Sequence, residues 1–204
     1  MTFWAGAVLK SADKKKFREK GGAEMGLKNI KLLLTDVDGV LTDGKVYLGI
    51  KEEFAGFDIQ DGIGHRLAAH GGLAVGWLSG RISKPVVLRA RKLKVPYVYQ
   101  GSLDKLTVAE SLCDKLDLKL SEVAYMGDDL IDLPLLTSVG WAATVPYGRP
   151  EVKKAVHYVT RAPAGGGALR EVVEKILKAR GDWDKAVKLF HRANRQSSSK
   201  RGLD

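Results

Sequence analysis

Short apolar runs alternate with amphipathic stretches along most of this chain, and no other feature constrains the fold as strongly. Four runs are too short and too apolar for solvated helices and are typical of buried strands: 30–35, 74–78, 123–126 and 140–144. Helical periodicity lies between and after them, at 63–69, 84–93, 104–116 and 129–137. Strands that alternate with helices predict an α/β fold with a Rossmann-like parallel sheet.

Residues 45–59 depart from this alternation. Two strand-like segments flank a short polar link there, which is typical of a β-hairpin. We therefore expect a hairpin inserted between the first strand and its helix. Ser102 is the expected cap of the helix at 104–116.

We expect three segments along the chain. Residues 1–28 form a basic N-terminal extension that is a candidate for disorder, with Met25 as a possible start. Residues 29–180 form one domain that ends in an amphipathic helix. Residues 181–204 form a further helix, at 182–193, and a disordered basic tail from Gln196.

The ends of the chain carry its excess positive charge. The formal net charge is +10, yet residues 29–174 contain equal numbers of basic and acidic side chains. A surface that follows a nucleic-acid backbone needs cations on the folded domain, so this pattern argues against a nucleic-acid partner and favours solvated tails. No apolar run is long enough to span a bilayer, and Cys113 has no second cysteine to pair with. We expect a cytoplasmic protein.

Two carboxylates follow the first apolar run. The segment LLLTDVDGVLT at 32–42 places Asp36 and Asp38 at a strand end, where open α/β sheets bind ligands. Burying two carboxylates is costly unless a cation compensates their charge, so a metal is the natural partner. Gly39 would let the backbone turn sharply beside them. An ordinary turn capped by aspartate is the alternative interpretation.

A second acidic group follows the run at 123–126, where Gly127 precedes Asp128, Asp129 and Asp132. Oxygen ligands without histidine or cysteine suit Mg²⁺ rather than zinc. Asp129 and Asp132 can instead cap the following helix, so we count them as supporting residues and Asp128 as the candidate ligand.

Candidate anion-binding residues lie between the two acidic groups. Ser79 and Gly80 follow the second apolar run, and Lys105 begins a predicted helix. A hydroxyl, backbone N–H groups and one ammonium are enough to hold a phosphate. Taken singly, Ser79 could be a helix cap and Lys105 a surface lysine.

The order D-x-D-G, Ser, Lys and G-D-D-x-x-D, each at a predicted strand end, resembles the four motifs of the haloacid dehalogenase superfamily. The resemblance implies that Asp36 is a nucleophile that forms an aspartyl-phosphate and that Asp38 is the general acid and base. It implies a Mg²⁺ ion held by the Asp36 carboxylate, the Asp38 backbone carbonyl and Asp128. The implied phosphate-binding residues are Ser79, Gly80 and Lys105.

About 20 residues separate Asp38 from the next helix, which leaves no room for a helical cap domain. The chain is similar to the capless subgroup, in which a hairpin takes the place of the cap. Four stretches carry this similarity: TDVDGVLTDG at 35–44, F-x-x-x-D-G-x-G at 57–64, LSGR at 78–81 and G-x-G-A-x-R-E at 165–171. The subgroup includes phosphatases of 3-deoxy-D-manno-octulosonate 8-phosphate, which belong to lipopolysaccharide biosynthesis, and of KDN 9-phosphate.

The resemblance implies hydrolysis of a phosphorylated sugar acid, with the octulosonate foremost because Arg81 follows Gly80. It also implies a homotetramer with shared active sites, in which Gly167 and Arg170 face a neighbour's pocket. Gln60, where a cation is common, and Ala164, in place of a glycine, depart from the subgroup pattern. The alternatives are KDN 9-phosphate or another small sugar phosphate as substrate, or a scaffold of the same fold without catalysis.

Overall fold

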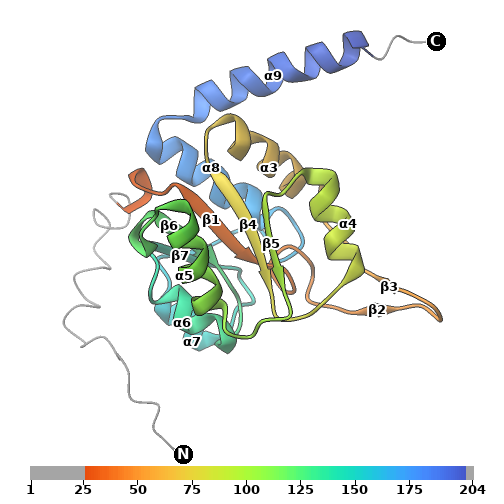
Figure 1. The fold of residues 1–204 in the computed structure, drawn as a ribbon, viewed down its shortest axis with the longest axis vertical. Helices are drawn as coiled ribbons and strands as arrows, with labels where there is room; N and C mark the ends of the chain where they lie inside the picture. Colours follow the sequence, from red (N-terminus) through yellow and green to blue (C-terminus); the bar gives the residue numbers. More distant parts are fainter. Residues whose placement is uncertain (1–25, 201–204) are drawn as a thin grey trace, which may run out of the picture.

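The computed structural model describes residues 26–200, with side chains as far as residue 196. Six parallel strands form one sheet in the order β5-β4-β1-β6-β7-β8 (Figure 1). Their bounds are Leu32–Asp36 (β1), Ala74–Ser79 (β4), Tyr97–Gln100 (β5), Val123–Met126 (β6), Trp141–Thr144 (β7) and Tyr158–Val159 (β8). The predicted α/β fold with a Rossmann-like parallel sheet is confirmed, and all four predicted strands belong to the sheet.

Helices cover both faces of the sheet (Figure 1). One layer consists of Ile59–His70 (α3), Lys84–Leu93 (α4), Ala168–Arg180 (α8) and Trp183–Lys200 (α9), and the other of Lys105–Leu116 (α5), Leu133–Leu136 (α6) and Pro150–Ala155 (α7). Short 3-10 helices span Leu120–Glu122 (η1) and Leu130–Asp132 (η2). Successive side chains of β1 serve both layers, because Leu33 packs with the first and Leu32 and Leu34 with the second.

The strand order reverses beside β1. The chain builds β4 and β5 on one side of β1 and then crosses to build β6, β7 and β8 on the other. The carboxyl end of β1 is therefore the switch point at which open α/β sheets bind ligands. Among residues 26–200, no helix combines the length and apolarity needed to cross a bilayer.

Several elements differ from the sequence prediction. Asp104, not Ser102, caps α5, and its side chain accepts a hydrogen bond from the Thr107 backbone N–H at 3.1 Å. The sequence prediction lacks β5, whose residues YVYQ are only half buried, and β8, which has two residues. It also lacks α7, a six-residue helix too short to show periodicity.

The C-terminal helix is longer than predicted. It runs to Lys200, beyond the predicted end at residue 193, and the disordered tail expected from Gln196 stays a prediction. Ala186 is buried in the core, and Trp183 and Phe190 pack against it, so the first half of α9 packs on the rest of the fold. The described range leaves out residues 1–25, which belong to the expected N-terminal extension, and residues 201–204. The predicted segment boundaries after residues 28 and 180 stay predictions.

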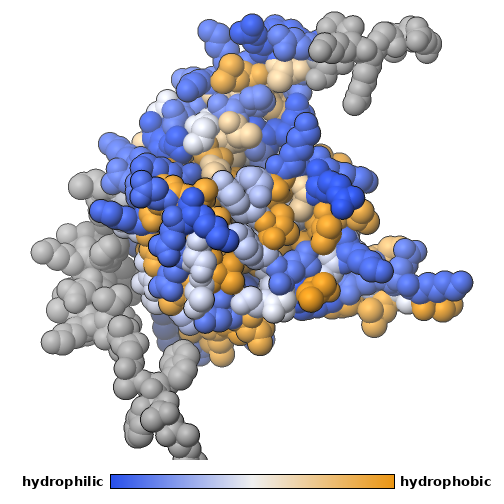
Figure 2. Space-filling view, viewed as in Figure 1, coloured by the Kyte–Doolittle hydropathy of each residue, from blue (hydrophilic) through white to orange (hydrophobic). Residues whose placement is uncertain are grey.

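The predicted hairpin consists of β2 (Tyr47–Leu48) and β3 (Glu53–Phe54), which pair antiparallel. It projects from the body of the domain, and hydrophobic residues lie along this arm beside charged ones (Figures 1 and 2). Five large apolar side chains on it are exposed: Val46, Tyr47, Leu48, Ile50 and Phe54. A single two-stranded hairpin is marginal alone, so an arm of this kind gains stability from contact with another surface.

Asp61 joins the first turn of α3 to the start of α8. Helix α8 begins after Gly167, its N-cap, which offers no capping side chain. The Asp61 Oδ1 atom instead accepts a hydrogen bond from the Arg170 backbone N–H at 2.9 Å, while Oδ2 has no hydrogen-bond partner among the described residues. Burial raises the pKa of Asp61 to about 6, although hydrogen bonds from the backbone of α8 lower it.

This raised pKa predicts a pH-dependent stability. An unfolded aspartate loses its proton near pH 4, whereas folded Asp61 keeps it until about pH 6. The stabilising contribution of protonated Asp61 is therefore present below pH 4 and lost as the pH rises to about 6. We expect the free energy of unfolding to fall more steeply over this interval in the wild type than in Asp61→Asn. Urea titrations at several pH values measure it, and parallel curves would contradict the role given to Asp61.

Candidate active site

Three strand ends bring the predicted site residues together. Asp36 is the last residue of β1, Ser79 is the last residue of β4, and Asp128 lies two residues beyond β6. Because β1 lies between β4 and β6 in register, their carboxyl ends meet at one edge of the sheet. Lys105 reaches the same place from the first turn of α5.

A buried lysine links two of the carboxylates. The Lys105 Nζ atom lies 2.6 Å from Asp36 Oδ1 and 2.7 Å from Asp132 Oδ1, and the lysine is 2% exposed. Burial by itself would lower the pKa of Lys105, but the charges of Asp36 and Asp132 outweigh burial and raise the pKa. The interpretation of Lys105 as a surface lysine is therefore wrong.

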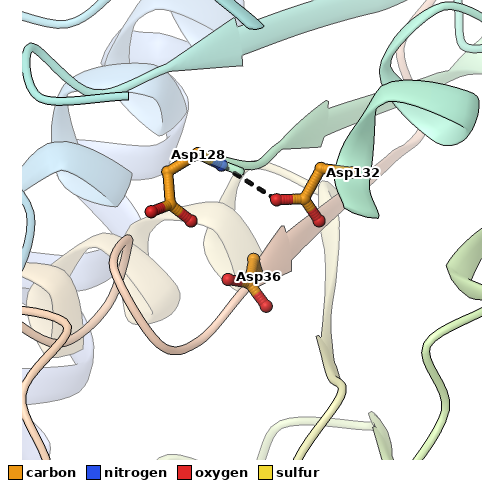
Figure 3. A group of neighbouring side chains, drawn as sticks. All are labelled: Asp36, Asp128 and Asp132. Carbon is orange, nitrogen blue, oxygen red and sulfur yellow. Dashed lines mark hydrogen bonds between the residues drawn. The ribbon is translucent and has the colours of Figure 1, made fainter. Parts of the chain in front are cut away.

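Asp132 is the residue that the sequence analysis undervalued. It is fully buried, and its Oδ1 atom also accepts a hydrogen bond from the Tyr125 hydroxyl at 2.6 Å. Its Oδ2 atom accepts from the backbone N–H groups of Asp128 at 2.9 Å and Asp129 at 3.1 Å. Asp132 thus holds the lysine, and its hydrogen bond to the Asp128 backbone also holds the loop that carries Asp128 (Figure 3). Its distance of four residues from Asp128 is typical of such a turn, but the sequence gives no sign of its burial.

Asp36, Asp128 and Asp132 form a cluster of oxygen donors. One carboxylate oxygen from each lies within 4.8 Å of the others (Figure 3). Burial raises the pKa of Asp36 to about 8, and burial followed by the charges of Asp132 and Asp129 raises that of Asp128 to about 6. Three carboxylates around one ammonium leave an excess of negative charge, and a divalent cation with a preference for oxygen would balance it.

Gly39 fits the backbone close to this cluster. Its φ is +95°, which favours glycine, and a Cβ atom there would collide with the Asp128 carboxylate. The Asp36–Gly39 turn and the Asp128 loop therefore approach each other more closely than any side chain at residue 39 would allow. This close approach supports a metal site rather than an ordinary capped turn.

Asp38 lies at the open side of the cluster. Its Oδ2 atom accepts a hydrogen bond from the Ser79 hydroxyl at 3.3 Å, and its Oδ1 atom lies 3.4 Å from Arg81 Nη1. The Ser79 hydroxyl also accepts a hydrogen bond from the Arg81 backbone N–H at 3.1 Å, so Ser79 is not a cap of α4, which begins after Ser83. Gly80 lies between them, where a Cβ atom would meet the Leu103 side chain.

The remaining predicted residues lie farther from the cluster. Asp129 is exposed, caps η2 and lies 3.7 Å from the Arg149 guanidinium. The Arg170 Nε atom pairs with Glu174 at 2.8 Å, on the side of α8 that faces α9. Gly167 precedes α8 with a φ of +93°. The structure therefore does not bring Arg170 to the acidic cluster of its own chain.

Comparison with known proteins agrees with this geometry. The model of the haloacid dehalogenase-like hydrolases matches residues 91–171. The 3-deoxy-D-manno-octulosonate 8-phosphate phosphatase of Escherichia coli K12 is 42% identical over 159 residues, which are 78% of this chain and 85% of that protein. This chain belongs to the haloacid dehalogenase-like hydrolases, in the family of these phosphatases.

Solved structures of this family have the same fold. The phosphatase of Moraxella catarrhalis, in complex with a magnesium ion, a phosphate ion and KDO, is 36% identical with a TM-score of 0.81, and the match covers 84% of this chain and 99% of that one. The phosphatase of Yersinia pestis is 39% identical with a TM-score of 0.77, over 79% of this chain and 88% of that one.

The buried position of Asp132 in this hydrolase predicts a large loss of stability in Asp132→Asn. An amide keeps an acceptor for Lys105 and Tyr125 but turns its NH₂ group toward the two backbone donors and removes a charge from a buried pair. We expect a loss of about 3 kcal/mol in the free energy of unfolding. Urea denaturation with a chelator present measures this loss without a contribution from metal binding.

Asp129→Asn is the matched control for this prediction. Residue 129 is exposed, and asparagine caps a helix as well as aspartate does. We expect a change below about 0.5 kcal/mol. Equal losses in the two variants would show that the Asp132 network contributes little.

Proposed function

We propose that this protein is a Mg²⁺-dependent phosphatase that hydrolyses 3-deoxy-D-manno-octulosonate 8-phosphate. The observation that carries the proposal is the buried arrangement of Asp36, Lys105 and Asp132 beside Asp128 at the carboxyl end of β1. A non-catalytic scaffold has no need for this costly set of buried charges. The names of the E. coli and Y. pestis relatives, and the ligands of the M. catarrhalis structure, support the substrate.

The reaction would proceed in two steps on the chain's own carboxylates. An Asp36 oxygen attacks phosphorus, the bond from phosphorus to the sugar oxygen breaks, and Asp38 gives its proton to that oxygen. Asp38 then takes a proton from a water molecule, whose oxygen attacks the aspartyl-phosphate. The bond from phosphorus to Asp36 breaks, which releases phosphate and restores both residues.

The donor set fits a magnesium ion. The Asp36 carboxylate, the Asp38 backbone carbonyl and Asp128 would hold it, with Asp129 close by and Asp132 fixing the Asp128 loop. When bound, Mg²⁺ supplies the positive charge that keeps Asp36 ionised and offsets the charge of the phosphate. Lys105 supplies a further, fixed positive charge that needs no rearrangement during the reaction.

The phosphate and the sugar acid would be held by different groups. The Ser79 hydroxyl, the Gly80 backbone and the Lys105 ammonium would bind the phosphate oxygens, over which the transition state spreads its charge. Arg81, whose side chain is 40% exposed at the mouth of the site, would bind the carboxylate of the sugar acid. Gln60 offers no positive charge for that task, which leaves it to Arg81 or Arg170.

Phosphate release from a panel of substrates tests the proposal. The panel contains 3-deoxy-D-manno-octulosonate 8-phosphate, KDN 9-phosphate and simple sugar phosphates, each with Mg²⁺ and with a chelator. We expect the octulosonate to be hydrolysed fastest and only with Mg²⁺. Asp36→Asn should lower kcat by roughly a thousandfold or more, because the amide is not a nucleophile.

The other outcomes separate the alternatives. Faster turnover of another phosphate would retain the mechanism and reject the octulosonate. An absence of turnover with every substrate would favour the scaffold. Unchanged turnover in Asp36→Asn would reject the nucleophile. Asp117→Asn, which changes an exposed carboxylate beyond α5, is the control that should leave turnover unchanged.

We further propose that four copies assemble through the hairpin and that Gly167 and Arg170 face the site of a neighbour. The exposed apolar side chains of β2 and β3 support a hairpin interface. Arg170 pairs with Glu174 away from the acidic cluster of its own chain, which supports a role for Arg170 at the site of another subunit.

We propose the cytoplasm as the location, because the one cysteine is buried and has no disulfide partner. We propose lipopolysaccharide biosynthesis as the pathway.

Leu48→Asp and Ile50→Asp test the hairpin interface. Both side chains are among the most exposed apolar groups of the described chain, so a charge there should leave the fold intact and disrupt apolar contact between copies. We expect light scattering to give four times the chain mass of 22.2 kDa for the wild type and a smaller mass for these variants. Lys51→Asp is the control, and a wild-type mass of one chain would reject the assembly.

A further inference from the structure

The hairpin is connected to the catalytic edge of the sheet through one carboxylate. Glu53 lies on β3, and its Oε2 atom accepts a hydrogen bond from Arg81 Nη2 at 2.8 Å. Its Oε1 atom accepts one from the Ser83 hydroxyl at 2.9 Å. Ser83 is itself buried, and its backbone N–H donates to the Gln100 side chain at 2.6 Å. Both oxygens of Glu53 are therefore fixed by the body of the domain.

Two carboxylates share the Arg81 guanidinium, and they hold it unequally. Nη2 lies 2.8 Å from Glu53, a full hydrogen bond, whereas Nη1 lies 3.4 Å from Asp38, at the limit of one. A free arginine side chain has many rotamers, and a charged partner in the active site would attract it. Glu53 is the group that decides between the possible positions of this guanidinium.

We propose that Glu53 is a positioning residue that acts through Arg81. It holds the guanidinium at the mouth of the site and prevents it from closing on Asp38, the group that must exchange protons with the leaving oxygen and with water. The inference rests on the proposed function only for this role of Asp38. Because Glu53 belongs to the hairpin, the position of the hairpin also sets the position of Arg81.

Glu53→Gln separates the two bonds of Glu53. Its amide oxygen can still accept a hydrogen bond from the Ser83 hydroxyl, but its NH₂ group cannot accept one from Arg81. Without that bond, the guanidinium is free to form a full pair with Asp38. We expect kcat to fall about fivefold, the effect of losing one partly exposed ion pair, on 3-deoxy-D-manno-octulosonate 8-phosphate and on glucose 6-phosphate, which carries no carboxylate.

The Arg81→Ala background shows whether Glu53 acts through Arg81. If it does, Glu53→Gln lowers kcat in the wild type and has no effect when Arg81 is already alanine. A residue that only holds the hairpin in place would cause the same loss in both backgrounds. Equal losses in the two backgrounds, or no loss in the wild type, would overturn the proposal.

Two control variants separate charge and hairpin docking from the position of Arg81. Glu52→Gln makes the same change of charge on the adjacent exposed residue and should leave kcat unchanged. Ser83→Ala removes one bond between hairpin and body but leaves the Glu53–Arg81 pair, and it should also leave kcat nearly unchanged. A loss in Ser83→Ala equal to that in Glu53→Gln would overturn the proposal, because Ser83→Ala leaves the Glu53–Arg81 pair intact.

A spectroscopic measurement tests the inference without turnover. Nitrogen-15 NMR of the arginine side chains, assigned by the loss of a signal in Arg81→Ala, reports rotation of the guanidinium. We expect the Arg81 Nη signals to be resolved in the wild type and in Glu52→Gln and to move or average in Glu53→Gln. Identical spectra in the wild type and Glu53→Gln would overturn the proposal, even if none of the substrates were hydrolysed and the proposed function had failed.

Discussion

The buried ammonium of Lys105 is the interaction on which the rest of the site depends. Its Nζ atom lies between the Asp36 and Asp132 carboxylates, and without this cation the two acids would be buried beside each other with no compensating charge. Lys105 joins α5 to the end of β1 and to η2, the 3-10 helix that follows β6, at the same time. Helix α5, which connects β5 on one side of β1 to β6 on the other, therefore also carries the charge that holds Asp36 and Asp132 together.

That interaction also explains the division of tasks among the acids. Both carboxylate oxygens of Asp132 already accept hydrogen bonds from Lys105, Tyr125 and the backbone of the Asp128 loop. Asp132 therefore holds these groups in place and has no oxygen left for a ligand. Asp36 and Asp128 keep oxygens turned toward each other and toward the space beyond β1. Asp36 and Asp128 keep the oxygens that a metal and a phosphate would need, and burial, followed by the charges of neighbouring acids, raises the pKa of both.

The sequence predicts the positions of site residues well where they follow a strand, and poorly where contacts between distant segments determine whether a residue is buried. Asp36, Ser79 and Asp128 follow apolar runs, so the parallel sheet alone brings them together. The burial of Asp132 and the cap that Asp61 gives α8 depend on contacts between segments far apart, which periodicity does not reveal. The same holds for β5, whose half-buried aromatic sequence lacks the uniform apolar pattern of the central strands.

The single chain leaves its own site open, and the surface around the mouth bears on the assembly proposed above. Phosphoryl transfer depends on electrostatic contacts that water weakens, yet Arg81 is 40% exposed. Four apolar side chains follow β4, β5 and β6 around the same opening and are exposed: Ile82, Leu103, Leu130 and Ile131. A small polar substrate would gain little from contact with an apolar rim, whereas a second protein surface could bury these side chains. The missing cap domain and this apolar rim therefore both support the proposed assembly, in which a neighbouring copy would close the active site.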